Sequence, residues 1–244
     1  MQLRGVRETE NGLIIHNETE EDMEQTTDNS TKSRILDEAL VMFAENGYKG
    51  TNLRDLAARL GLSKSALYKH YESKEAIWNA LLDRMETYYG EQFGSAEHLP
   101  EVPKSGEELL ALSMKRIAFT LQDERIILTR KLLLTEQFHD ERVCKLATKH
   151  FLVGTQRMFT AIFSVMMAEG VMKKDDPEML AVMYTSPVTS LIQLCTREPE
   201  RQAEVMERCE AFLRYFIDTY VENGFSERRK LERENFGVER QPEK

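Results

Sequence analysis

Apolar residues recur every three or four positions along most of the chain, which is the period of a helix buried on one face. Capping residues and glycines divide this pattern into segments, because Ser, Thr and Asp favour helix starts and Gly favours helix ends. The alternation typical of strands is not seen in the sequence. We therefore predict an all-α fold, with helices over 31–47, 51–60, 63–72, 74–93, 105–122, 124–138, 140–169, from 176 to before Pro199, and 199–223.

Two details of this pattern concern helix ends. The first helix is expected to begin at Ser30 or Thr31, whose hydroxyls can cap it, and to end at Gly47. The helix from 176 contains Pro187, which removes a backbone donor and clashes with the preceding turn. We expect that helix to kink or break near Ser186.

Residues 51–74 predict two short helices joined by a tight turn. Thr51 is expected to cap the first helix and Ser63 the second. Gly61 lies between them, where a sharp turn needs a positive φ. One face of the pair is apolar, formed by Leu53, Leu56, Ala57, Leu60, Ala66, Leu67 and Tyr71. This is the pattern of a helix-turn-helix, whose second helix lies in the major groove of DNA.

Charge supports the same interpretation. Residues 47–71 carry five basic side chains, those of Lys49, Arg54, Arg59, Lys64 and Lys69, against the single acid Asp55, so their net charge is +4. The whole chain has a formal net charge of −9. A local basic region on an acidic protein is typical of a surface that contacts DNA.

Residues 35–82 resemble the N-terminal domain of TetR-type transcriptional regulators. The resemblance is carried by Phe43 with Gly47-Tyr48 at a helix end, by Leu-Gly-Leu-Ser at 60–63, and by Leu67-Tyr68-x-His70-Tyr71-x-Ser73-Lys74-Glu75. Tyr71 stands where phenylalanine is commoner in the family. About a fifth of the chain is covered, and the rest matches only in length and helical pattern. The resemblance implies a three-helix DNA-binding domain followed by a helical domain for ligand binding and dimerisation.

Position on the second short helix and the family pattern together predict the DNA contacts. Lys64, Ser65 and Lys69 are expected to reach base edges, and Thr51, Tyr68, His70 and Lys74 to contact phosphates. Arg54 and Ser63 are assigned to the same surface.

Composition along the chain suggests four regions. Residues 1–30 hold eight acids against two arginines, so we expect a disordered acidic tail, either a solvated extension or an arm that modulates DNA binding. The DNA-binding domain is expected at 31–76 and the effector-binding and dimerisation domain at 77–224. A charged tail at 225–244 completes the chain.

The sequence lacks the motifs of catalysis, so we predict no enzyme, no metal and no cofactor. It shows no glycine-rich phosphate loop, no nucleophile elbow and no His-Glu-x-x-His, and its five histidines are dispersed. His150 is expected in a pocket or core rather than on a metal. The three cysteines are expected to be buried and reduced in a cytoplasmic protein, with a redox sensor as the alternative. No apolar run approaches the roughly 18 residues of a membrane span.

The resemblance also implies a pocket for a small, partly apolar effector. Methionines gather in the two helices of 140–169 and 176–198, where they either fill the core or line that pocket. Helical phase and amphipathic character select the candidate lining residues, which are Tyr89, Met114, Phe151, Met158 and Tyr184.

A homodimer is expected, because the last two helices each carry a wide apolar face. Two helices from each subunit would bury both faces in one twofold interface, formed by Val188, Leu191, Ile192, Cys195, Cys209, Phe212, Leu213 and Phe216. The alternative is that these faces belong to the core of a single chain.

The sequence leaves three functional hypotheses. The preferred hypothesis is a ligand-responsive, dimeric repressor that binds a double-stranded DNA operator. A nucleoid-organising protein of the same fold would bind many dispersed sites instead. An all-α enzyme or carrier with an incidental helix-turn-helix would need a catalytic constellation or cofactor, and the sequence supplies neither.

Overall fold

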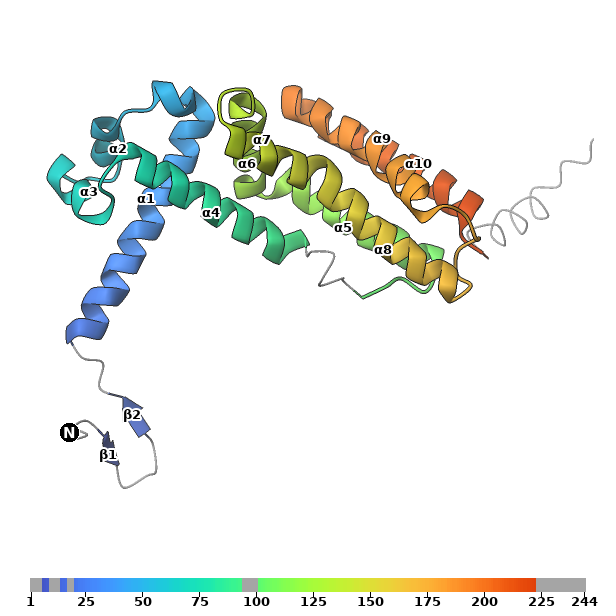
Figure 1. Cartoon of the computed structure of the whole chain (residues 1–244), viewed down its shortest axis with the longest axis horizontal. Coiled ribbons are helices and arrows are strands. Elements are labelled where there is room, and N and C mark those ends of the chain that lie inside the picture. The colour runs from blue at the N-terminus through green and yellow to red at the C-terminus, as the bar shows by residue number, and fades with distance from the viewer. Residues whose placement is uncertain (1–5, 9–13, 17–19, 94–100, 223–244) are drawn as a thin grey trace, which may run out of the picture. The chain divides into compact units, whose positions relative to one another are not determined.

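The computed structural model describes residues 6–8, 14–16, 20–93 and 101–222 (Figure 1). The predicted all-α fold is confirmed, since these residues are almost wholly helical. One feature was not predicted: β1 (Val6–Glu8) and β2 (Ile14–His16) pair as a short antiparallel hairpin. Contacts divide the chain into two units, Met1–Leu81 and Leu82–Lys244. The remainder of the predicted acidic tail before residue 20, and the predicted charged tail at 225–244, lie outside the described residues.

Helix α1 (Glu20–Gly50) is longer than predicted. Its start is at Glu20 rather than at Ser30 or Thr31, so the predicted tail and first helix overlap. The sequence there begins Glu-Glu-Asp, and acidic residues are favourable near the positive end of a helix dipole. The predicted end is close to the observed one, because Gly47 has φ 71° and ψ 172°, a conformation essentially restricted to glycine, and breaks the helical path there.

The core of the first unit forms where α1 meets α2 (Leu53–Arg59), α3 (Lys64–His70) and the first turns of α4 (Lys74–Phe93). Phe43 and Trp78 lie edge to face with ring centroids 5.0 Å apart, and Tyr48 lies 5.0 Å from Trp78. Such aromatic pairs add to the stabilisation that burial itself gives. The predicted apolar stripe of α1 is buried around them, with Ile35, Leu36, Ala39, Leu40 and Phe43 all 7% exposed or less.

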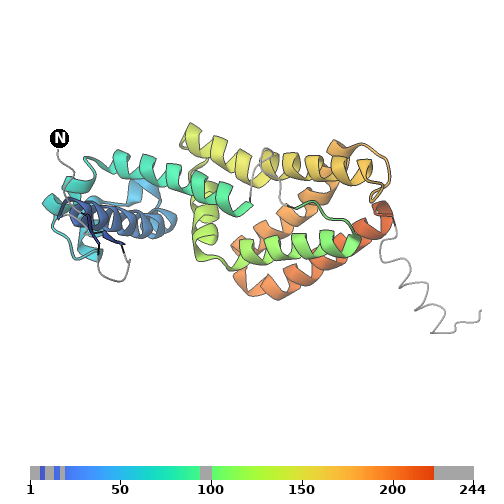
Figure 2. The same ribbon diagram turned by 90° about the horizontal axis from the view of Figure 1, so that it is seen from below.

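The second unit is a helical bundle (Figure 2). Its elements are α5 (Gly106–Gln122), α6 (Glu124–Glu136), α7 (Glu141–Thr148), the π-helical turn η1 (Lys149–Val153), α8 (Gly154–Ala168), α9 (Pro177–Arg197), the 3₁₀ turn η2 (Pro199–Arg201) and α10 (Gln202–Tyr220). Capping side chains mark four of the helix starts, since Ser105, Asp123, Asp140 and Asp176 each accept a bond from a backbone N–H of the first turn. In both views α5, α8, α9 and α10 run beside one another.

Two predicted helices differ in detail. The helix expected over 140–169 is α7, η1 and α8, with a π-helical turn in the middle. The helix with Pro187 was expected to kink or break near Ser186. It does not break, since α9 runs continuously from Pro177 to Arg197, and the kink stays a prediction. Packing of α9 against α8 and α10 outweighs the backbone hydrogen bond that proline removes.

The core of the second unit is built from aromatic and aliphatic side chains of α5, α8, α9 and α10. Phe163, Tyr184 and Phe216 form its centre, with ring centroids 4.7 to 5.8 Å apart. The methionines fill this core rather than a pocket: Met158, Met166, Met167 and Met172 are buried, whereas Met179 and Met183 are exposed.

Two helical stretches among the described residues, Glu141–Ala168 and Pro177–Arg197, are long and apolar enough to cross a bilayer by length and composition alone. Core helices pass the same test, and Phe163, Met166 and Tyr184 from these stretches are buried in the bundle core. We therefore treat them as core helices.

The cysteine prediction is partly wrong. Cys195 and Cys209 are buried, but Cys144 is exposed on α7. Burial raises the pKa of the Cys209 thiol to about 11 and raises that of Cys195, so both buried thiols stay protonated near neutral pH.

Candidate DNA-binding surface and ligand pocket

The two short helices meet at a tight turn around Gly61, which has φ 68° as predicted. The N–H of Leu62 donates to the carbonyl of Ala57 at 2.8 Å, and the N–H of Gly61 donates to Ala58 at 3.1 Å. These bonds satisfy carbonyls that the end of α2 would otherwise leave without partners. Ser63 caps α3, as predicted, by accepting from the N–H of Ala66 at 3.1 Å.

The predicted role of Thr51 is wrong. Asn52 caps α2 instead, because its side chain accepts from the N–H groups of Arg54 and Asp55. Thr51 is only 2% exposed, and its hydroxyl donates to the carbonyls of Met42 and Gly47 at the end of α1. The Thr51 side chain therefore holds the helix-turn-helix onto α1 and does not present its hydroxyl to DNA.

The outer face of α3 carries the side chains predicted to read bases. Lys64, Ser65 and Lys69 are exposed, and Tyr68 is 41% exposed beside them. The Lys64 ammonium lies 5.6 Å from the centroid of the Tyr68 ring, within reach of a cation–π contact. Of the remaining predicted contacts, Arg54 and Ser63 are exposed and His70 is half-buried.

The side chains of Lys74 and Arg59 bind other groups within the DNA-binding domain. Lys74 is half-buried at the start of α4, where its ammonium donates to the carbonyl of Thr51 at 2.6 Å and lies 4.4 Å from the centroid of the Tyr48 ring. Its contact with a phosphate stays a prediction. Arg59 pairs with Glu38 at 2.8 Å, so part of the basic region is neutralised from α1.

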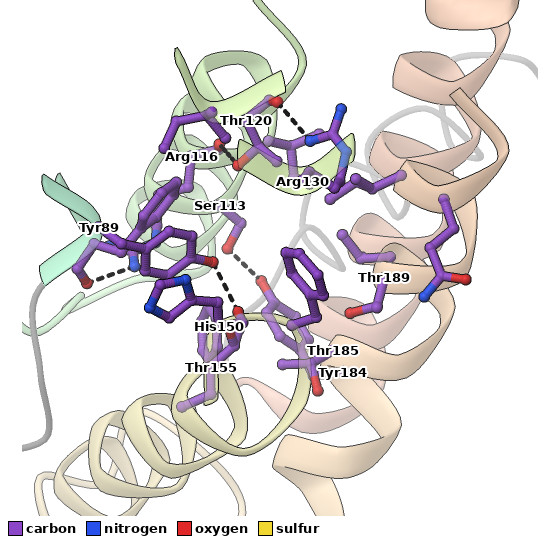
Figure 3. Close-up of a pocket in the computed structure, with 18 of the residues that line it drawn as sticks. Tyr89, Ser113, Arg116, Thr120, Arg130, His150, Thr155, Tyr184, Thr185 and Thr189 are labelled. Atoms are coloured by element: carbon purple, nitrogen blue, oxygen red, sulfur yellow. Dashed lines mark hydrogen bonds between the residues drawn. The ribbon is translucent and has the colours of Figure 1, made fainter. Parts of the chain in front are cut away.

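A pocket lies inside the second unit, between the end of α4, α5, α6, η1, α8, α9 and α10 (Figure 3). Its volume is about 100 Å³, whereas one water needs roughly 10–15 Å³ on the same measure, so a molecule of several heavy atoms fits. Aromatic and aliphatic side chains form most of the wall. Polar groups are interspersed, namely Ser113, Thr120, Thr129, Thr155, Thr185, Thr189 and Gln193.

Three of the predicted lining residues are in the wall, and two are not. Tyr89, Phe151 and Tyr184 line the pocket. Met158 is packed into the bundle core at 3% exposure, and Met114 packs half-buried against the same core. Helical phase misplaced Met158 because η1 shifts the rotation of the chain between α7 and α8.

Tyr89 and His150 form one side of the pocket. Their rings stack with centroids 3.9 Å apart and planes 5° from parallel, and the Tyr89 hydroxyl donates to the backbone carbonyl of His150 at 2.7 Å. Burial, with Lys149 adding to it, lowers the pKa of His150 to about 4. Its Nδ1 atom is buried with no hydrogen-bond partner among the described residues. His150 is thus a neutral pocket residue, and burial raises the pKa of Tyr89 to about 12.

Two arginines that the predictions missed also line the pocket. Arg130 is only 5% exposed, and Arg116 is half-buried. Both lie in the inner stripe of their helices, Arg116 beside Ile117 on α5 and Arg130 one turn after Ile126 on α6. A charged residue at an apolar position of a helix was the available sequence signal.

Comparisons with known proteins agree with this geometry. Residues 35–81, which contain the helix-turn-helix, match the profile of the family described as bacterial regulatory proteins, tetR family. The chain is 36% identical over 58 residues to the biofilm operon icaADBC HTH-type negative transcriptional regulator IcaR of Staphylococcus epidermidis, a match to 24% of this chain and 31% of that protein. It is 31% identical over 97 residues to the uncharacterized HTH-type regulator YerO of Bacillus subtilis, covering 40% and 32% of the two chains.

Residues 35–81 thus form a DNA-binding domain of the TetR type.

The matches to these curated relatives span about a third of their length. Across the whole fold, this TetR-type chain is similar to SmeT, the repressor of the Stenotrophomonas maltophilia multidrug efflux pump SmeDEF. The SmeT–triclosan complex aligns with a TM-score of 0.62 at 21% identity, over 80% of this chain and 93% of SmeT. At that identity the likeness establishes the fold alone.

Most residues predicted for the dimer interface of this TetR-type chain serve inside the monomer. Val188, Ile192 and Leu213 line the pocket. Cys195, Cys209 and Phe216 are 6% exposed or less and belong to the core, together with Leu213. This corrects the prediction for six positions, because the faces of α9 and α10 that carry them turn inward. Leu191 and Phe212 are half-buried and remain candidates.

Proposed function

We propose that this TetR-type regulator is a cytoplasmic, homodimeric repressor that a small, partly apolar effector releases from its DNA operator. The observation that carries the proposal is the presence in one chain of both required sites. An exposed basic face on α3 suits DNA, and a mainly apolar pocket with a few polar groups suits a small ligand.

Helix α4 supports a coupling between the two sites. It begins at Lys74, bonded to Thr51 beside the helix-turn-helix, and ends at Phe93 in the pocket wall. Tyr89, one turn from its end, is stacked on His150. A ligand that moves the end of α4 would therefore change the placement of α3, and dimers must hold their recognition helices about 34–36 Å apart to engage both half-sites.

Two relatives support a regulator of this kind. IcaR, similar over the helix-turn-helix, is a negative transcriptional regulator, and SmeT, similar in fold, is a repressor seen in complex with triclosan. Neither the operator nor the effector is carried over from them.

The dimer surface is proposed on the outer faces of α9 and α10. Met179, Val182 and Met183 of α9 are 40% to 56% exposed, and Tyr215 of α10 is 68% exposed. These side chains lie on the same two helices that were predicted to dimerise, on the side away from the core. Exposed apolar side chains on two neighbouring helices suit a twofold interface.

The test begins with selection of bound DNA from a random duplex library by the full-length protein. We expect one short inverted repeat to be enriched and protected as a single footprint. Compounds that raise the thermal midpoint of the protein are then titrated against the free protein and the DNA complex. Linkage requires that an effector bind the free protein more tightly by the same factor by which it weakens DNA binding.

Two results would contradict the proposal. Protection of many dispersed, unrelated sites would favour a nucleoid-organising protein. Equal affinity of each ligand for free and DNA-bound protein would exclude release by an effector.

A further inference from the structure

The charged residues of the pocket all have the same sign. Among the described residues that line it, Arg116 and Arg130 are the ionised side chains, and the lining contains no aspartate or glutamate. In Figure 3 both arginines lie with Thr120 on one side of the pocket, opposite Tyr184 and Thr185. The pocket is thus an apolar space with a cationic wall on one side.

Neutral groups bind these two guanidiniums. Arg130 donates from Nε to the Thr196 hydroxyl at 2.7 Å and from Nη1 to the carbonyl of Thr120 at 2.9 Å. Arg116 donates from Nη2 to the carbonyl of Phe93 at 2.6 Å and lies over the Phe93 ring. A guanidinium has five N–H donors, so each arginine has donors beyond those these bonds occupy.

Helix ends supply only part of a counter-charge. Phe93 is the last residue of α4, and Thr120 lies in the last turn of α5, so both carbonyls belong to the negative end of a helix. Such an end is equivalent to roughly half an elementary charge. Tyr89 and the thiol of Cys195 add none near neutral pH, because burial raises the pKa of both. Burial also lowers the pKa of both arginines, in keeping with a pocket wall that holds no carboxylate beside them.

An uncompensated buried cation costs free energy, and an anion that enters the pocket would remove that cost. We propose that the effector is an amphipathic organic anion, a carboxylic or sulfonic acid, whose head group is bound by Arg116 and Arg130. Its ring or chain lies against Ile117, Phe159, Tyr184 and Leu213. This inference rests on the proposed function and names the chemical class of the effector.

The same head group acts on α4. Arg116 now holds the carbonyl at the end of α4, and a carboxylate or sulfonate is a stronger acceptor than a carbonyl because the bond is charge-assisted. The anion therefore draws Arg116 from Phe93 and loosens the end of the helix that begins at Lys74. Neutral ligands of the same shape leave this bond in place.

The test compares two small probes of one skeleton, titrated calorimetrically into the full-length protein without DNA. Benzoate is an anion, and benzamide is its neutral counterpart of the same size. We expect the wild-type protein to bind the anion about tenfold to a hundredfold more tightly, the range for hydrogen bonds to charged groups. Arg130→Met and, separately, Arg116→Met should each reduce that preference by about tenfold or more.

Lys131→Met is the matched control, because Lys131 is the next residue on α6 and is exposed. It removes one positive charge without changing the pocket wall, and we expect both probes to bind as to the wild type. Circular dichroism and thermal midpoints establish that each variant is folded. Should both arginine variants unfold, the preference of the wild-type protein decides the outcome.

Several results overturn the proposal: equal binding of the two probes, no binding of the anion, or an anion preference that the folded Arg116→Met and Arg130→Met variants retain. These results concern the pocket alone. An anion preference without any effect on DNA binding would support the anion site and contradict the proposed function. Release of DNA by neutral ligands, with no anion preference, would support the proposed function and contradict the anion site.

Discussion

The side chains around α3 differ in how firmly their own domain holds them. Lys64, Ser65 and Lys69 are exposed, whereas Lys74 is bonded to a carbonyl and Thr51 is buried with its hydroxyl bonded to the end of α1. Exposed side chains can adapt to base edges, and held ones fix the angle at which the helix docks. This difference leads to two separate expectations for substitutions.

Lys64→Ala should relax sequence preference. Lys64 is the first residue of α3, and the N-terminal residues of a recognition helix contact base edges. We expect a loss of about 1–3 kcal/mol on the selected operator and little change on unrelated DNA. Fluorescence anisotropy with both duplexes measures this, and an equal loss on both would assign Lys64 to phosphate instead.

Lys74→Ala should weaken binding to every sequence. If its ammonium contacts a phosphate, the slope of log affinity against log salt becomes shallower by about one unit. The bond to Thr51 offers a purely structural role, in which thermal stability falls and the salt slope does not change. Lys145→Ala, at an exposed position in the second unit, is the control.

His150 should make stability depend on pH. Its pKa is about 4 in the folded chain and about 6.5 when unfolded, so its contribution is complete above pH 6.5 and is lost as pH falls toward 4. Between about pH 7.5 and pH 5 the wild type should lose about 2 kcal/mol more than His150→Phe, which keeps a ring against Tyr89. Urea unfolding at both pH values measures the difference, and parallel losses would show that His150 does not titrate as inferred.

At the scale of elements, local signals explain what the sequence could predict. Gly61 determines the turn of the helix-turn-helix through its backbone conformation, and Ser63 caps α3 through one hydrogen bond. Both features can be predicted from the local sequence alone. Thr51 was predicted as the cap in place of Asn52 because both residue types cap helices, and only packing against α1 decides which one is buried.

The pocket was less predictable, because its wall depends on a change of helical phase. The π-helical turn η1 directs His150 and Phe151 to the pocket, and Met158 then falls in the core. Periodicity carried through 140–169 at a constant 3.6 residues per turn cannot anticipate this. Likewise, nothing local distinguishes an apolar face that dimerises from one that lines a pocket, as Val188 and Ile192 show.

Gly154→Ala tests the π-helical turn. A Cβ at Gly154 would lie 2.5 Å from the carbonyl oxygen of Lys149, closer than real contacts allow, and the backbone would have to shift. We expect lower stability and weaker ligand binding, although Gly to Ala inside a helix normally stabilises by about 1 kcal/mol. Gly90→Ala on α4 is the matched control, since its Cβ would meet no atom within 4 Å, and it should stabilise. Equal stabilisation by both substitutions would contradict the role of Gly154.

At the scale of the whole molecule, the proposed dimer rests on a few exposed side chains. Met183→Glu combined with Tyr215→Glu places charges on the outer faces of α9 and α10 and should give a folded monomer at micromolar concentration. Sedimentation velocity measures this. Phe138→Glu is the control, because Phe138 is 84% exposed and lies away from those helices in sequence. A double variant that stays folded and dimeric would exclude this surface.

The buried arginines also determine how the protein would respond to selection for heat resistance. A buried charge without a counter-charge costs free energy, so replacing it with an apolar residue of similar volume can be neutral or stabilising. Substitution of Arg116 or Arg130 by methionine or leucine should therefore lower the free energy of unfolding little, or raise it. A screen that rewards survival on heating alone would collect such variants, and they would keep α3 intact while losing sensitivity to the effector. Thermostable descendants of this protein should accordingly be permanent DNA binders that no longer respond.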